Sequence, residues 1–247
     1  TKLKMKKFIV IITLCLAYSV NAQVAMSRYI QVKDGQREQF IKNAAMKTKI
    51  FNSIAGQTKF YTFNITTGPR TGEILRVRVE DSVQLMDNSN QKELDYWVKN
   101  VQKHHTSSNS ILWGLNKEAT YLPNNDSKKM SRVIEYNIKS NSLEDFWRFR
   151  TRVAKAAKES GANVHMWVWD CVSGCDGNTV WVSFGHDNYK EFWEDNTKEW
   201  AKVSSKYAEL YGEGSYEKDI LDLDNSLEMY GKRTFNSELI PELSSSF

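Results

Sequence analysis

A long internal repeat constrains what this 247-residue chain can fold into. The segment Ser27–Lys33 returns as Ser131–Asn137, at an offset of 104 residues, and Gly56 returns as Gly161. Solenoid repeats have periods of roughly 20 to 50 residues, so a period this long indicates a duplicated domain instead. The polar segment Pro123–Lys129 lies between the copies and has the composition of a linker. We therefore expect two copies of one folding unit.

Both copies show the same expected order of elements: strand, helix, strand, strand, helix, strand. Alternating apolar residues predict the strands of the first copy at Arg28–Val32, Lys59–Ile65, Ile74–Glu80 and Glu118–Leu122. Those of the second copy are Arg132–Ile138, Asn163–Cys171, Asn178–Gly185 and Leu227–Tyr230. Helices follow Gly35 and Ser142, and further helical regions span Asp81–His105 and Asn188–Tyr211. This is the order of the ferredoxin-like β-α-β-β-α-β unit. The expected fold class is α+β, with two tandem units packed sheet to sheet as an intramolecular α/β barrel.

The first 22 residues show the pattern of an export signal. Lysines precede the apolar run Phe8–Ala17, and Val20 and Ala22 stand three and one residues before a cleavage point after Ala22. A membrane-spanning helix needs about 20 apolar residues, which favours a cleaved signal over an anchor. We expect a secreted or periplasmic protein with no stable membrane anchor. The expected domains are 1–22 (signal), 23–122 (first half), 123–129 (linker), 130–232 (second half) and 233–247 (C-terminal extension).

The charge of the chain argues against a nucleic-acid partner. It has 34 basic and 30 acidic residues, and four of the basic residues are lysines within residues 1–22, where no acidic residue stands. The remainder is formally neutral, so its overall charge attracts neither nucleic acid nor an anionic lipid surface.

Two cysteines remain after the expected cleavage, Cys171 and Cys175. Their spacing fits a turn whose ends approach closely, and an exported protein meets an oxidising compartment, so we predict a local disulfide. A redox-active pair is more typically spaced C-x-x-C, and a metal site needs further ligands nearby that are not evident. We expect no metal.

Alternation of side chains along the strands predicts an inner cavity. One strand face of each copy is almost entirely apolar and is expected to pack on the helices. The opposite, mixed faces are expected to enclose an aromatic-lined lumen. The candidate ligand-binding residues of the lumen are His165, Trp167, Trp169, Trp181, Glu135, Asn137, Arg76 and Arg78. Because most of them belong to the second copy, we expect that copy to carry the site. The alternative is a filled barrel core.

The duplicated pattern resembles the dimeric α/β-barrel superfamily, which includes stress-responsive barrel proteins and antibiotic-biosynthesis-type monooxygenases. The resemblance covers about Met26–Leu122 and Met130–Gly231, and rests on element order, the repeat and the segment Asp187–Trp193. It implies that two tandem copies supply in one chain what two subunits supply elsewhere. Haem-degrading members use an Asn on the first strand, a Trp on the second helix and a His ten residues later. Asn137 and Trp193 match this pattern, but Val203 stands at the histidine position.

These features favour a binding function over an assigned reaction. We find no P-loop, no dinucleotide fingerprint and no zinc motif. The expected function is that of an exported domain binding a small apolar or aromatic ligand, or a partner, without a cofactor. The alternative is a cofactor-independent monooxygenase or isomerase acting on a small aromatic or anionic substrate, so the sequence leaves open whether the chain is an enzyme. The expected assembly is a monomeric pseudo-dimer or a low-order homo-oligomer.

Overall fold

The computed structural model describes residues 23–124 and 128–246, and the expected export signal lies outside these residues. The first half contains β1 (Val24–Val32), α2 (Arg37–Phe51), β2 (Lys59–Ile65), β3 (Ile74–Glu80), η1 (Val83–Asp87), α3 (Gln91–Asn100), η2 (Gln102–His104), β4 (His105–Ser107) and β5 (Ile111–Leu115). The second contains β6 (Met130–Ile138), α4 (Leu143–Ser160), β7 (His165–Ser173), β8 (Asn178–His186), η3 (Glu191–Asp195), α5 (Asn196–Tyr211), α6 (Ser215–Asn225), β9 (Leu227–Leu239) and η4 (Pro241–Leu243).

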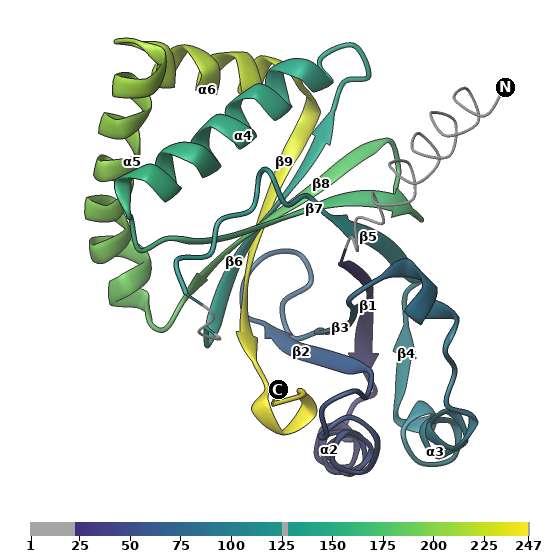
Figure 1. The fold of residues 1–247 in the computed structure, drawn as a ribbon. Coiled ribbons are helices and arrows are strands. Elements are labelled where there is room, and N and C mark those ends of the chain that lie inside the picture. Colours follow the sequence, from purple (N-terminus) through teal and green to yellow (C-terminus); the bar gives the residue numbers. More distant parts are fainter. Residues whose placement is uncertain (1–22, 125–127, 247) are drawn as a thin grey trace, which may run out of the picture.

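The strands of both halves join into a closed barrel (Figure 1). Eight strands follow one another in the order β1-β3-β2-β9-β6-β8-β7-β5, and β5 pairs again with β1. Every pairing between these strands is antiparallel. Strand β4 adds to the edge of β1 beyond β5. The predicted α+β class and barrel are therefore confirmed.

Three apolar clusters hold the fold together. One fills the barrel and draws on both halves, from Ala25 and Trp113 to Trp181 and Phe235. A second lies between the sheet and helices α4, α5 and α6, which cover the outer face of the second half (Figure 1). A third lies between the sheet and helices α2 and α3 and includes Leu243 of η4. The barrel thus has an inner core and two outer helix layers.

An ion-pair network ties the helices of the second half to one another. The carboxylate of Asp219 on α6 accepts hydrogen bonds from Arg148 at 3.1 Å, Arg152 at 2.8 Å and Tyr207 at 2.5 Å. Burial acts to raise the pKa of Asp219, but these three hydrogen bonds outweigh it and lower the pKa. The ionised carboxylate therefore stabilises the packing of α4, α5 and α6.

The last strand of the first half does not lie where the sequence pattern placed it. Strand β5 is Ile111–Leu115, whereas the expected segment Glu118–Leu122 contributes only an isolated bridge from Tyr121 to Met166. Trp113 is 1% exposed inside the barrel. We attribute the position of β5 to the burial of this large side chain. The alternation of residues 118–122 carries no information about that burial, so it predicted the wrong segment.

The chain after Arg233 is not a separate extension, because β9 continues to Leu239. It pairs with β6 over most of its length and with β2 at Ser237–Leu239, so it joins the two halves. The following turn places Leu243 fully buried against the helix layer of the first half. The expected boundary at residue 233 therefore falls inside a strand.

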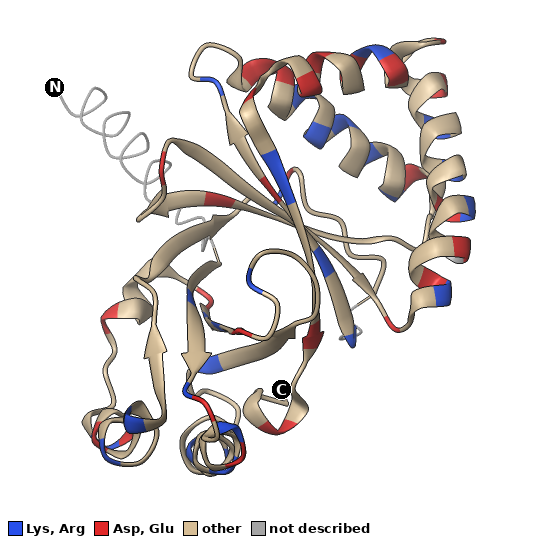
Figure 2. Cartoon of the chain, turned by 180° about the vertical axis from the view of Figure 1, so that it is seen from behind, with Lys and Arg blue, Asp and Glu red and all other residues tan. Residues whose placement is uncertain are grey.

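Among the described residues, the buried Lys, Arg, Asp and Glu side chains are Lys47, Arg76, Arg150 and Asp219. Both signs are interspersed along the helices of the second half (Figure 2). In the part of the chain that the structure describes, no helix is long and apolar enough to cross a membrane.

Candidate ligand pocket

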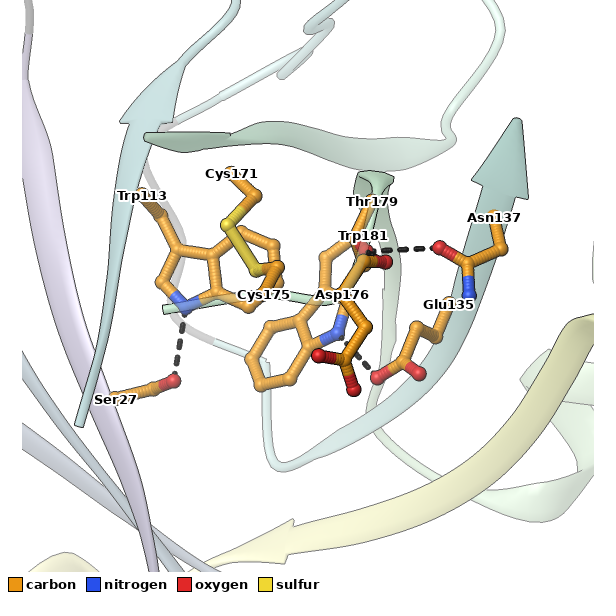
Figure 3. The surroundings of a disulfide bond; sticks show 9 residues. All are labelled: Ser27, Trp113, Glu135, Asn137, Cys171, Cys175, Asp176, Thr179 and Trp181. Atoms are coloured by element: carbon orange, nitrogen blue, oxygen red, sulfur yellow. Dashed lines mark hydrogen bonds between the residues drawn. A yellow bond between two sulfur atoms is a disulfide. The ribbon is translucent and has the colours of Figure 1, made fainter. Parts of the chain in front are cut away.

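The lumen of the barrel is filled by its own side chains. Trp113 and Trp181 stack with their ring centroids 4.3 Å apart (Figure 3). Tyr29 and Phe235 meet Trp181 edge-on, with centroids 6.4 and 6.1 Å away. All four side chains are buried. The centre of the barrel is therefore packed as a core.

The predicted disulfide lies beside these rings. Cys171 and Cys175 are joined with an S–S distance of 2.02 Å and a Cα–Cα distance of 6.4 Å. Figure 3 shows it next to the two stacked indoles. The indole N–H of Trp181 donates to Glu135 at 3.0 Å, so this carboxylate has a partner within the barrel. The disulfide fixes the β7–β8 hairpin against the inner core.

The six expected site residues of the second half lie on the inner strand face but do not converge. His165 faces Gly185 near one end of β8, and Asn137 faces Thr179 near the other. A strand rises about 3.3 Å per residue, so these two ends are about 20 Å apart. Between them lie Trp167, Trp169, Trp181 and Glu135. One small ligand does not reach all six.

The two polar residues at the ends of this row are engaged within the fold. His165 Nε2 is 2.8 Å from Oδ1 of Asn124, and its ring tilts against Trp167. Asn137 Oδ1 accepts the hydroxyl of Thr179 at 2.9 Å. The alternative of a filled core therefore describes the lumen better than a ligand cavity does.

Arg76 and Arg78 lie on the outer face of the sheet, which corrects their expected place in the lumen. In the register of β1 and β3, Arg28 faces Arg76 and Tyr29 faces Leu75. Cross-strand partners share a face, and Tyr29 and Leu75 belong to the inner cluster. The prediction failed because the first half packs its more apolar strand face into the barrel. The face with the arginines turns toward α2 and α3.

A pocket of about 220 Å³ lies between this outer face and the two helices. Phe60 of β2 and Trp97 of α3 supply aromatic walls, and the guanidinium carbon of Arg76 is 4.3 and 5.2 Å from their ring centroids. The guanidinium of Arg28 lies 5.0 Å from the Trp97 centroid. The charged lining consists of Arg28, Lys47, Arg76, Arg78 and Glu93. Four cations thus share the pocket with one carboxylate.

The guanidinium of Arg76 is buried but only partly hydrogen-bonded. Nη1 donates to Thr62 Oγ1 at 2.8 Å and to the carbonyl of Leu243 at 3.2 Å. Within residues 23–124 and 128–246, Nε and Nη2 have no hydrogen-bond partner. Burial, followed by repulsion from Arg28, lowers the pKa of Arg76 to about 9. Two donors of a buried cation thus have no acceptor among these residues.

Lys47 of α2 places an ammonium beside Arg76. Its Nζ pairs with Glu93, donates to Asn52 Oδ1 at 2.7 Å and lies 3.8 Å from the Phe60 ring centroid. Burial, followed by repulsion from Arg76, lowers the pKa of Lys47 to about 7, against the opposing effect of Glu93. Lys47 therefore changes its protonation near neutral pH.

Arg78 holds the rim of the pocket in place. It pairs with Glu80 at 2.8 Å and donates to the carbonyls of Leu85 at 2.9 Å and Asn88 at 3.1 Å. Asn88 itself lines the pocket. Because these bonds occupy its guanidinium, Arg78 positions the η1–α3 segment instead of offering donors to a ligand.

Most of this pocket is not evident from the amino-acid sequence, although one signal is present. The buried residues of α2 include Phe40, Ala44 and Lys47, at the spacing of an apolar stripe. Residues three and four apart share a helix face, so a lysine at this spacing marks a buried cation. The juxtaposition of Arg28 and Arg76 depends on strand register, which the sequence did not reveal.

The pocket does not fit a haem. An engineered cavity of about 150 Å³ holds one benzene molecule, so about 220 Å³ is room for a single ring with a substituent. None of the described residues that line this pocket is a histidine. In residues 23–124 and 128–246, no group of three or more His, Cys, Asp or Glu side chains is arranged to hold a metal ion.

A second cavity, of about 460 Å³, lies beside the start of α5 and has a polar lining. Its partly buried cation, Lys128, pairs with Asp187 and Glu191 at 3.0 Å each. Because these charges neutralise one another, this cavity attracts a charged ligand less strongly than the pocket in the first half does.

The fold and pocket define an α+β protein with a closed eight-stranded antiparallel barrel and a cationic, aromatic-walled pocket under one helix layer. No family model matches the chain, and no curated protein matches it. Solved structures share its ferredoxin-type barrel fold. A "putative monooxygenase" from Lactobacillus acidophilus NCFM is 13% identical with a TM-score of 0.56, over 91% of this chain and 96% of that one. Chlorite dismutase from Candidatus Nitrospira defluvii, in complex with imidazole, is 9% identical with a TM-score of 0.54, over 92% and 95%. At these identities the likeness shows the fold alone.

Proposed function

We propose that this protein is a binding protein that takes a small molecule in the pocket between β1, β3, β2 and helices α2 and α3. The observation behind this proposal is the contrast between a filled lumen and an outer pocket of about 220 Å³. Ligand sites are concave, with apolar walls and a few placed polar groups, and Phe60, Trp97 and Arg76 provide these. The site then belongs to the first half, not to the second.

The proposal extends to architecture and location. We assign the chain to the dimeric α/β-barrel superfamily, as two tandem ferredoxin-like units. The strand orders β5-β1-β3-β2 and β9-β6-β8-β7 support this, because the first, second, third and last strands of each unit take the same relative places. We further propose a secreted or periplasmic location. The signal-like pattern of residues 1–22 and the Cys171–Cys175 disulfide support it.

The test uses three single-ring probes of different charge: benzoate, benzylamine and benzyl alcohol. Each is titrated into the full chain while the side-chain N–H signals of the tryptophans are followed by NMR. We expect at least one probe to shift the Trp97 signal in a saturable manner and to leave the Trp113 and Trp181 signals in place. Shifts confined to Trp113 and Trp181, or no saturable shift with any probe, contradict the proposal.

A cofactor-independent monooxygenase or isomerase is the second candidate. Lys47 favours it, because a group with a pKa of about 7 inside a pocket is suited to act as a general base. The Lactobacillus acidophilus protein described as a "putative monooxygenase" shares the fold, which is compatible with this candidate. The measurement is oxygen uptake with a single-ring hydroquinone. Uptake that is lost in Lys47→Met supports this candidate, and equal uptake by both proteins contradicts it.

A further inference from the structure

Resting on the ligand site proposed above, we propose that the pocket binds a single-ring aromatic anion. The anionic group pairs with Arg76, Arg28 and Lys47, and the ring packs against the walls formed by Phe60 and Trp97.

The arrangement of donors on Arg76 matches an oxyanion. Its unpartnered nitrogens, Nε and Nη2, form one edge of the guanidinium, while Nη1 is held by Thr62 and Leu243. Two parallel N–H groups on one edge bind a carboxylate or a phosphate in a bidentate manner. The fold thus fixes the guanidinium by one end and leaves the buried Nε and Nη2 edge without an acceptor among the described residues.

The surrounding charge is not balanced by the protein. Arg28 and Arg76 are direct cross-strand partners, an arrangement that is destabilising for like charges. Lys47 adds a third cation at the same place, and among the described residues Glu93 is the one carboxylate in the lining. Burial and repulsion already lower the pKa of Arg76 and Lys47. A bound anion relieves this repulsion and supplies the missing hydrogen-bond acceptors.

The second half shows that the fold does not require a cation at the position of Arg76. Arg132 repeats Arg28 at the offset of 104 residues and lies on the equivalent strand. The cross-strand partner of Arg132 on β8 is Phe184, whereas the partner of Arg28 on β3 is Arg76. Phe184 packs on Trp200 at 5.7 Å, within the apolar layer beneath α4 and α5. An apolar side chain therefore serves this position structurally, so packing of the strand does not call for the guanidinium of Arg76.

The size of the pocket sets the size of the ligand. About 220 Å³ exceeds the roughly 150 Å³ that holds benzene and leaves room for one anionic substituent. The aromatic walls distinguish such a ligand from an inorganic anion, which gains nothing from them.

The experiment compares benzoate, benzamide and inorganic phosphate by titration calorimetry with the full chain below pH 7, where Lys47 carries its charge. Benzoate and benzamide have the same shape and differ in charge. We expect benzoate to bind at least about tenfold more tightly than benzamide or phosphate, which corresponds to about 1.4 kcal/mol. Arg76→Met is expected to lose this preference. Arg28→Gln, a change at a half-buried side chain, replaces Arg76→Met should that variant fail to fold.

Arg132→Gln is the matched control, because it removes the equivalent arginine of the second half and is expected to bind benzoate like the wild type. Equal affinities for benzoate and benzamide overturn the anion inference while leaving the binding site proposed above intact. Phosphate binding as tight as that of benzoate overturns the claim that the ligand carries an aromatic ring. Benzoate binding that survives both Arg76→Met and Arg28→Gln contradicts the assigned contacts. No binding of benzoate, benzamide or phosphate up to about 10 mM overturns this inference, and the proposed function falls with it when benzylamine and benzyl alcohol also fail to bind.

Discussion

Replacing Trp181 with Ala tests whether the barrel interior is a packed core. Trp181 is 6% exposed and stacks on Trp113. Removing a buried indole deletes about 200 Å² of buried surface, roughly 5 kcal/mol at ~25 cal/mol per Å². Measured losses for such truncations are about 3–5 kcal/mol. We therefore expect a loss of about 4 kcal/mol, and a fall in Tm of roughly 8–16 °C for a chain of this size.

The assay is urea unfolding followed by far-UV circular dichroism, with the slope of the transition compared between variants. Trp193→Ala is the control, because Trp193 is 74% exposed and its loss is expected to change stability by less than about 0.5 kcal/mol. Benzoate affinity of Trp181→Ala, measured below its transition, is expected to equal that of the wild type. A stability loss under about 1 kcal/mol with an unchanged slope refutes the packed-core interpretation. So does loss of benzoate binding at normal stability.

Three further predictions concern pH and stability. Because an anion favours charged Lys47, benzoate affinity is expected to be level below about pH 7 and to fall by up to about tenfold per unit above it; a level profile contradicts this. Replacing Cys171 and Cys175 with Ser is expected to lower the free energy of unfolding, measured in urea, by about 2 kcal/mol. An unchanged free energy of unfolding would show that the disulfide does not stabilise the hairpin. Asp219→Asn is expected to lower the free energy of unfolding by about 3–5 kcal/mol at neutral pH. Because the pKa of Asp219 is lower in the folded than in the unfolded chain, the wild type loses this contribution as the pH falls below about 4, and the variant is expected to lack that loss. Unchanged acid unfolding contradicts the last prediction.

The alternation of apolar and polar residues predicted the bounds of several strands correctly. The bounds of β2 and β3 match the expected Lys59–Ile65 and Ile74–Glu80. Alternation also assigned the correct faces in the second half, where Val168 and Val182 pack beneath the helices. In these segments one face is apolar and the other carries polar groups. The two-residue period of this alternation is therefore enough to identify the strand.

Alternation divides a strand into two faces but does not show which face meets the helices. In the first half both faces are buried, since aromatic rings of Phe60 and Trp97 accept Arg76 beneath the helix layer. The more apolar face could then enter the barrel. The continuation of β9 past Arg233 was missed for a related reason, because its partners lie far away in sequence, on β2 and β6. Long-range pairing and the choice of inner face are decided by the assembled barrel.

A crystal structure with 4-bromobenzoate is the most direct test of where the ligand binds. The anomalous signal of bromine marks the ring, and the carboxylate is read from the surrounding density. The account predicts one bromine site between the sheet and α3, with the carboxylate on the Nε and Nη2 edge of Arg76. Bromine inside the barrel beside Trp113 and Trp181, with none near Arg76, would contradict it.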